Sequence, residues 1–489
     1  MAIYVLFLYP QPGVADQGDF DRVMNVSGLK VEPQFASGSD SPRFLKYTIT
    51  DYDIAAINPS QLLNRITATS MCYPITLISL ICKLCGQQTF RTTYLAVFYL
   101  LVYIFSLWVI LYNLKIDSAL KFLGILAMVL LVFLDGNYLI WFNSLYGEPM
   151  MITTLLLFIA AWINYSNKSK PIAGLFLAIM LVFITAFLFI GSKLQVISAL
   201  PVLLLLLAKL LTDNRKYLKN YQLSILCLFY VIIIIYPVNL NLKNKDINRD
   251  TQYDSVFYGI LKNSYNPAED LTALNLDPDL AVESGKHSFL DRSQYVQYAP
   301  HTEITREKFY SQISNGKLIK YYLTHPARLL NGMKYTASQA FYTSTTLGKY
   351  PQSYSEKPIS DFDRFIFWSS LRGHQLPRSL LFIGSILASV MAISIHCFKN
   401  TDDQAVRSKI LLLWGVVAIG ILQFPMPFVG NGEADTAKQL FLFNFIFDII
   451  LVFLAFCFWS VIVDFSAFIS SFTTNKIFSR AHINRINEV

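Results

Sequence analysis

The sequence predicts an all-α polytopic membrane protein with about ten membrane-spanning helices, interface helices and a mostly helical domain outside the membrane. Three observations lead to this fold class. Of the 489 residues, 54% are hydrophobic and only 15% are charged, whereas ordinary soluble domains contain about 25% charged residues. Nine apolar segments approach the roughly 20 residues that a membrane helix needs. Basic residues gather in alternate connections between these segments.

The first part of the chain, residues 1–91, contains little that could cross a membrane. Its opening segment, MAIYVLFLYP, is apolar but too short to span. We interpret it as the outer end of a first helix that is truncated here or starts upstream. Residues 73–86 are also apolar, and we expect them to lie in the membrane interface, with a spanning helix as the alternative.

The expected spans form two groups, one within residues 92–239 and one within residues 379–465. They are residues 94–111, 120–134, 150–163, 172–190, 196–211, 223–238, 380–396, 410–428 and 440–463. Residues 466–489 form a tail after the last span.

Lysine and arginine in short loops determine the orientation of membrane helices. Alternating spans place four basic connections and the C-terminal tail on one side, which we expect to be the cytoplasm. These residues are Lys115, Lys121, Lys168, Lys170, Lys209, Arg215, Lys216, Lys219, Lys399, Arg407, Lys409, Lys476, Arg480 and Arg485. The formal charge of +8 is therefore a topology signal and does not indicate a nucleic-acid partner.

The region 240–378 is far longer than the roughly 15 residues that a structureless loop usually reaches. We expect it to form a small, mostly helical domain on the outer side. Residues 302–323 show an amphipathic pattern that predicts one helix, His325-Pro326 ends that helix, and residues 327–342 predict another.

Three polar clusters are expected at the outer membrane boundary. The first follows the opening segment, the second occupies the loop 135–148, and the third precedes the last span. Their acidic members are Asp16, Asp19, Asp21, Asp135, Glu148, Glu433 and Asp435. Such carboxylates can act as a general base, bind a metal or bind a sugar hydroxyl, and the alternative for each is a solvated loop acid.

Within the spans, the main ionisable residue is Asp448, one helical turn after Asn444. The two side chains share a helix face. They either lock helix packing as a hydrogen-bonded pair or form the floor of an outward-facing polar cavity.

Several enzyme classes lack their motifs in this sequence. It contains no P-loop, no dinucleotide-binding G-x-G-x-x-G after a strand, no H-E-x-x-H and no G-x-S-x-G. Nucleotide-driven transport and ordinary hydrolase chemistry are therefore disfavoured.

Three blocks carry a family resemblance: GVADQGDFDRVMNVSGL at residues 13–29, WFNSLYGEP at 141–149 and GNGEADTAKQLFLFN at 430–444. The fragments VFYGILKNS at 256–264 and YYLTHPARLL at 321–330 add to it. Together with the architecture, they resemble the GT-C class of membrane glycosyltransferases, and within it the bacterial WsfD-type hexose transferases of surface-glycan synthesis.

The resemblance implies an inverting sugar transfer at the extracytoplasmic face of a bacterial plasma membrane. The donor would be a sugar on a polyprenyl phosphate, and the acceptor a surface polysaccharide or glycolipid. Asp19 matches the acidic loop position of the family and is the expected general base, with Asp16 as the alternative. The resemblance fixes no cofactor, and a divalent metal is possible because some GT-C enzymes use one.

Other residues are expected to bind the substrates. Positive charge is needed at the departing phosphate, and the candidates are Arg22, Lys193, Arg328, Arg364 and Arg372. The remaining expected substrate-binding residues are Asn143, Tyr146, Glu148, Glu433, Asp435 and Lys438.

Two other functions remain open. Polysaccharide polymerases also have many spans and a large outer loop, but arginines dominate their outer loops. A lipid-linked sugar flippase or another transporter should carry charge along a central path, whereas the spans here are almost free of ionisable residues.

Overall fold

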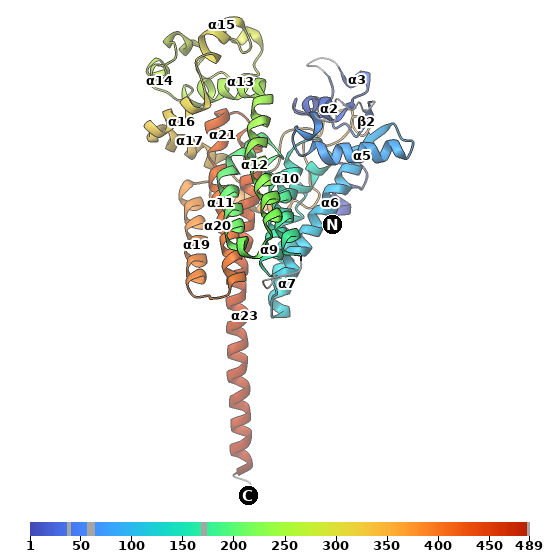
Figure 1. The fold of residues 1–489 in the computed structure, drawn as a ribbon, viewed down its shortest axis with the longest axis vertical. Coiled ribbons are helices and arrows are strands. Elements are labelled where there is room, and N and C mark those ends of the chain that lie inside the picture. The colour runs from blue at the N-terminus through green and yellow to red at the C-terminus, as the bar shows by residue number, and fades with distance from the viewer. Residues whose placement is uncertain (37–40, 56–63, 168–173, 487–489) are drawn as a thin grey trace.

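A computed structural model describes residues 1–36, 41–55, 64–167 and 174–486. Its helices form an elongated bundle with short helices, strands and loops at one end, which we call the polar end (Figure 1). The long C-terminal helix projects from the opposite end.

Nine helices of the bundle coincide with the nine expected spans. They are α6 (Thr92–Asn113), α7 (Ala119–Phe133), α9 (Glu148–Ser166), α10 (Leu175–Ile190), α11 (Leu200–Asn214), α12 (Asn220–Lys243), α19 (Leu380–Lys399), α20 (Gln404–Gln423) and α23 (Phe441–Ile486). A polytopic helical membrane protein is thus confirmed. The helix α23 continues without a break from the last expected span into the expected tail.

The expected count of about ten spans is not confirmed. Among the described residues, seven helical segments are long and apolar enough to cross a membrane. An eighth is counted if α7 is joined to α8 (Gly136–Leu139) and η1 (Ile140–Asn143), from which it bends by 51°. The difference arises because α10 has only 16 residues and α1 (Ala2–Leu6) only five. The expected span of α10 and its basic loop begin in residues 168–173, outside the described ranges.

The helix α9 lies at the centre of the bundle, where it contacts α6, α10, α20 and α23. Within its apolar stretch 83% of the residues are buried, against 17% in α19. Lipid-facing helices keep an exposed apolar side, whereas a fully surrounded helix does not. The first residue of α9, Glu148, is therefore held at the centre of one end of the bundle.

A three-stranded antiparallel sheet corrects the expectation of a purely helical chain. It consists of β1 (Leu29–Lys30), β2 (Asp51–Ile54) and β3 (Thr89–Arg91) in the order β1-β2-β3. Tyr52 on β2 lies opposite Phe90 on β3, and both side chains are buried. The neighbouring Asp53 is exposed. Strands of two to four residues are too short to show the alternation by which a strand is recognised.

This N-terminal part also contains the helices α2 (Phe20–Ser27), α3 (Pro33–Ala36) and α5 (Cys72–Leu84). The helix α5 has 13 residues, fewer than a span requires. It runs across the bundle axis in Figure 1, as a helix in the membrane interface would.

A helical module stands at the same end of the bundle. It contains α13 (Lys245–Tyr253), η4 (Asp254–Ile260), α14 (Pro267–Ala273), η5 (Pro278–Glu283), η6 (Arg292–Gln294), α15 (Glu303–Thr305), η7 (Arg306–Tyr310), α16 (Asn315–Thr324) and α17 (Pro326–Gln339). Its own apolar core includes the fully buried Phe257 and Phe309. Three short elements complete this end: α18 (Phe367–Gln375), α21 (Met426–Asn431) and α22 (Thr436–Gln439).

The single helix expected over residues 302–323 is wrong. The chain forms α15 and η7, leaves the helical path, and begins again with α16. The break occurs because Ser314 adopts an extended conformation and its side chain accepts a hydrogen bond from the amide of Lys317, which caps the new helix.

Candidate functional site

Asp19 lies at the start of α2, at the polar end of the bundle. The turn before it is shaped by Asp16, whose Oδ1 accepts hydrogen bonds from the amides of Gly18 (2.7 Å) and Phe20 (3.2 Å). Gly18 has φ = +99°, which favours glycine. Asp16 itself is only 2% exposed and faces Arg43. Burial raises the pKa of Asp16, although the two amides and Arg43 oppose this shift.

Two cations bind Asp19. Lys438 Nζ lies 2.7 Å from its Oδ2, and the guanidinium of Arg22 pairs with its Oδ1. Burial opposes the ionised form of Asp19, but Lys438, Lys193 and Arg22 together outweigh burial and hold its pKa well below the usual value. Asp19 is therefore an ionised carboxylate, with its side chain 30% exposed.

The loop before the last span is tied to the N-terminal loop through Gln17. Its amide nitrogen donates to both carboxylate oxygens of Asp435, at 2.9 and 2.8 Å. Its amide oxygen accepts from Lys438 Nζ at 3.1 Å. These hydrogen bonds of Gln17 join two loops that are more than 400 residues apart in the sequence. They also orient Lys438 toward Asp19.

Tyr146 and Glu148 extend this arrangement toward the centre of the bundle. The ring of Tyr146 lies beneath Lys438, with Nζ 4.5 Å from its centroid, and its hydroxyl donates to the carbonyl of Ala15 at 2.8 Å. Glu148 is fully buried, and its Oε1 pairs with Lys193 Nζ at 2.5 Å. Burial opposes the charge on Lys438, but Asp19, Glu148 and Asp435 raise its pKa above the usual value.

We call this group the ion-pair cluster. It comprises Asp19, Arg22, Glu148, Lys193, Asp435 and Lys438. The cluster contains three acidic and three basic side chains. An incoming anion would therefore compete with the carboxylates for the cations. The cluster thus offers positive charge for an anionic group beside a carboxylate that can accept a proton once it is released.

Two of the expected substrate-binding residues lie apart from these ion pairs. Glu433 binds Lys262 Nζ (2.5 Å) and Asn263 Nδ2 (2.8 Å) of the helical module. Asn143 donates to the carbonyl of Leu6 at 2.9 Å and accepts from Gln11. The first links the module to the loop 430–439, and the second fixes the N-terminal segment over the bundle.

The three remaining arginine candidates have structural partners. Arg328 pairs with Asp270 at 2.8 Å within the module. Arg364 donates to the carbonyls of Leu8 and Pro10, both at 2.8 Å. Arg372 forms a fully buried ion pair with Asp448.

The two polar residues of the last span act in packing. Asp448 accepts from Arg372 and, at 2.6 Å, from the hydroxyl of Tyr138. Asn444 accepts from the amide of Phe341 and donates to the carbonyl of Tyr342, each at 2.9 Å. They fasten α18 and the segment after α17 onto α23. The expected packing role thus holds for each side chain, but through these partners and not through a bond between Asn444 and Asp448.

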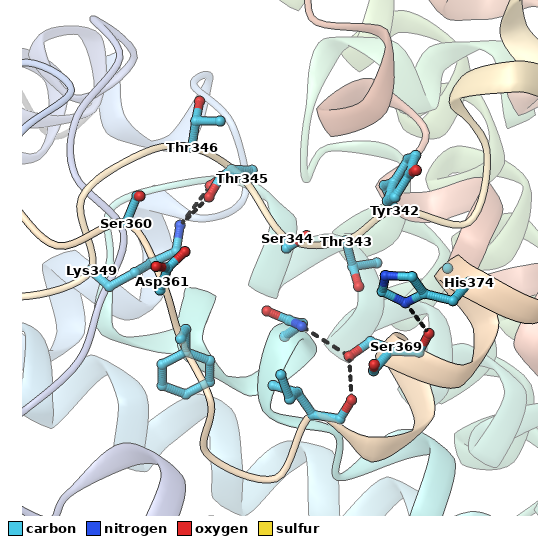
Figure 2. A pocket seen from close by; sticks show the side chains of 15 residues that line it. Tyr342, Thr343, Ser344, Thr345, Thr346, Lys349, Ser360, Asp361, Ser369 and His374 are labelled. Atoms are coloured by element: carbon cyan, nitrogen blue, oxygen red, sulfur yellow. Dashed lines mark hydrogen bonds between the residues drawn. The ribbon is translucent and has the colours of Figure 1, made fainter.

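Beside this segment lies a cavity of about 390 Å³ that sequence reasoning missed (Figure 2). We call it the hydroxyl-lined cavity, because seven of its 15 lining residues are serine or threonine. Lys349, Asp361 and His374 also line it. The residues come from α8, α18 and the segment 342–366, and only the serine- and threonine-rich stretch 343–346 could have signalled them.

The described ranges contain no group of three or more His, Cys, Asp or Glu side chains that could hold a metal ion. Asp19 and Glu148 face lysine and arginine, and Asp435 binds the amide of Gln17. This donor set does not fit the divalent metal that the resemblance allows.

The fold and the cluster together define a polytopic helical membrane protein with a charged site at one end of its bundle. The chain belongs to the family of the YfdI N-terminal transmembrane domain, whose family model matches residues 1–475. No curated protein and no solved structure matches the chain.

Proposed function

We propose that the protein is a GT-C-type membrane glycosyltransferase of the WsfD-like kind. It would transfer a sugar from a polyprenyl phosphate to a polysaccharide or glycolipid acceptor at the extracytoplasmic face, with inversion at the anomeric carbon. The observation that carries the proposal is the pairing of Asp19 with Lys438 and Arg22. This reaction requires a general base and phosphate-binding cations. Asp19, in contact with Lys438 and Arg22, would supply the first and its two partners the second.

The position of the cluster supports a lipid-linked donor. Glu148 begins the central helix α9, and Lys438 lies on α22, directly before α23. A polyprenyl phosphate would keep its chain in the bilayer and present its phosphate at the level where these helices end. Nucleotide sugars are cytoplasmic, whereas a lipid carrier can be flipped and can present its sugar at the outer face.

The ion pairs suggest how base and donor cooperate. A carboxylate whose pKa is held low is a weak base, so Asp19 bound to Lys438 and Arg22 is poorly suited to remove a proton. The donor phosphate would compete for these same cations. When it binds them, Asp19 loses its counter-charges, its pKa rises, and it becomes a better base only when the donor is present.

The chemical step then follows. Asp19 accepts the proton of the acceptor hydroxyl, and the hydroxyl oxygen forms a bond to the anomeric carbon. The bond between that carbon and the phosphate oxygen breaks, and its electron pair leaves with the polyprenyl phosphate. Lys438 and Arg22 stabilise the developing charge on the phosphate.

The test is the substitution Asp19→Asn in the full chain, reconstituted in vesicles with undecaprenyl-phosphate hexoses and a glycolipid acceptor. Release of undecaprenyl phosphate should fall by about 10²- to 10⁴-fold, the usual contribution of a general base. Asp53→Asn is the matched control, because Asp53 is exposed on β2 of the same N-terminal part. Full activity of Asp19→Asn would remove Asp19 from the role of base.

The same assay separates the alternatives. A transferase releases the lipid phosphate and adds one sugar to each acceptor, whereas a polymerase lengthens the acceptor by many units. A flippase moves labelled donor across the vesicle membrane and leaves the bond between sugar and phosphate intact.

A further inference from the structure

We propose that the hydroxyl-lined cavity binds a neutral, polyhydroxylated ligand, namely the sugar of the acceptor glycan. The inference rests on the proposed function for the identity of that ligand as acceptor. The cavity and its ability to bind a sugar stand on their own contacts.

The floor of the cavity is polar and already positioned. Asn137 donates through Nδ2 to Ser369 Oγ at 2.9 Å, and Ser369 Oγ donates to the carbonyl of Ile366 (Figure 2). Thr343 Oγ1 accepts from the buried Arg372 at 2.9 Å. Each of these groups retains a lone pair or a hydroxyl hydrogen for a further bond. Preformed donors and acceptors favour a ligand whose own groups both donate and accept, as sugar hydroxyls do.

The charges of the lining argue against a polyanion. Lys349 Nζ donates to the hydroxyl (2.7 Å) and the carbonyl (3.1 Å) of Thr345, and Asp361 supplies an opposite charge at the rim. Burial lowers the pKa of Lys349 to about 7, so near neutral pH the amine is in part uncharged and can accept as well as donate. The buried Arg372 nearby is neutralised by Asp448.

Shape and access also suit a sugar. Tyr342, Phe362 and Ile366 line the cavity and offer apolar surface for the C–H faces of a ring. Four of the lining residues, Ser344, Thr346, Ser370 and His374, are exposed, so the cavity is open to a ligand. A volume of about 390 Å³ lies at the lower end of the range for ligand sites, roughly 300–1,000 Å³.

The cavity is connected to the ion-pair cluster through the backbone. The segment that supplies Lys349 accepts hydrogen bonds from the N-terminal loop: Gly13 N donates to Lys349 O and Ala15 N to Gly348 O, both at 2.9 Å. Asp19 follows four residues after Ala15. A segment that lines the cavity is therefore hydrogen-bonded to the loop that carries the proposed base.

Direct binding tests the inference without any donor. The full chain in phosphatidylcholine nanodiscs, free of sugar detergents, is mixed with methyl α-glucoside, methyl β-galactoside and methyl α-mannoside, and saturation-transfer NMR is recorded. The variant Ser344→Trp fills the rim, and Ser353→Trp is its matched control, because Ser353 is exposed on the same segment but does not line the cavity.

We expect saturation transfer to at least one hexoside in the wild type and in Ser353→Trp, with at least a fivefold loss in Ser344→Trp. Thr346→Trp replaces Ser344→Trp if the latter fails to fold. Transfer to none of the hexosides in the wild type, or equal transfer in the blocked and control variants, would overturn the inference. Transfer that follows the expected pattern while Asp19→Asn stays fully active would instead overturn the proposed function and leave the cavity as a sugar site.

Discussion

Lys438 Nζ lies 2.7 Å from Asp19 Oδ2, although the two residues are 419 positions apart in the sequence. The lysine side chain is only 10% exposed, and it is also held by Gln17 and by the ring of Tyr146. Its position is therefore determined by groups other than Asp19. If a donor phosphate binds Lys438, it meets a cation that is already oriented.

We predict that Lys438→Gln lowers kcat/KM for the polyprenyl-phosphate donor by about 10- to 100-fold. A hydrogen bond to a charged group contributes about 1.5–3 kcal/mol, and each 1.36 kcal/mol corresponds to a tenfold rate change. Steady-state kinetics with varied donor concentration measure this effect. Lys262→Gln is the control, because Lys262 also pairs with a carboxylate, Glu433, in the contact that links the module to the loop 430–439. Equal losses in both variants would contradict a specific role for Lys438.

The pair of Glu148 and Lys193 leads to a stability prediction. Glu148 is fully buried, and its Oε2 has no hydrogen-bond partner among the described residues, so Lys193 is its main compensation. Lys193→Met leaves a buried carboxylate unpaired, which costs about 3–5 kcal/mol. The double variant Glu148→Gln/Lys193→Met should recover most of this loss, because it buries no unpaired charge.

Thermal unfolding of the full chain in nanodiscs measures this prediction. Lys209→Met provides the comparison, since both side chains of the Lys209–Asp213 pair are exposed. Exposed ion pairs contribute little to the free energy of unfolding. A double variant no more stable than Lys193→Met would show that the lost stability does not come from an unpaired Glu148.

The bundle was predictable because membrane helices satisfy their hydrogen bonds within one segment. Apolar length alone therefore located the nine helices of the bundle that coincide with the expected spans. It did not predict the length of α10. The apolar pattern extends from residue 172, which lies outside the described ranges, whereas α10 begins at Leu175. The three-stranded sheet was missed because its strands depend on distant partners and not on a local pattern.

The residues of the candidate site were predictable from the sequence, but the contacts between them were not. Asp19, Glu148 and Lys438 stood out as charged residues beside apolar segments. Apart from Arg22, which follows Asp19 by three residues, their partners could not be read from the sequence, because the other contacts join segments that are far apart along the chain. The role of Glu433 in binding the module, and the cavity beside Lys349, depend on the same long-range folding.

The buried pair of Arg372 and Asp448 is expected to be essential for folding. Both side chains are fully buried, and Arg372 also binds Tyr138 and Thr343. Arg372→Met should destabilise the chain by about 3–5 kcal/mol, seen as a lower unfolding temperature in nanodiscs. Arg372→Met/Asp448→Asn should be more stable than the single variant. Arg306→Met, which breaks an exposed pair with Glu303, should change stability little.

The helical module should become less stable as pH rises toward and through 7. Asp254 is fully buried at the start of η4, where its carboxyl accepts from the amide (2.6 Å) and hydroxyl (3.1 Å) of Ser288. Burial raises its pKa from 3.8 to about 7; Ser288 opposes this, and the acids Asp250 and Asp435 add to it. From about pH 4 to about pH 7 the unfolded chain loses this proton while the folded module keeps it, so the free energy of unfolding falls.

The variant Asp254→Asn removes this titration and can keep both contacts with Ser288. It should stabilise the module by a few kcal/mol near pH 8 and change it little near pH 4, as measured by hydrogen exchange of peptides from residues 254–289 with intrinsic exchange rates corrected for pH. Asp277→Asn is the opposing control: Lys308 lowers the pKa of Asp277, so this substitution should weaken the module at high pH. An equal effect of Asp254→Asn at both pH values would show that Asp254 does not hold a proton in the folded module.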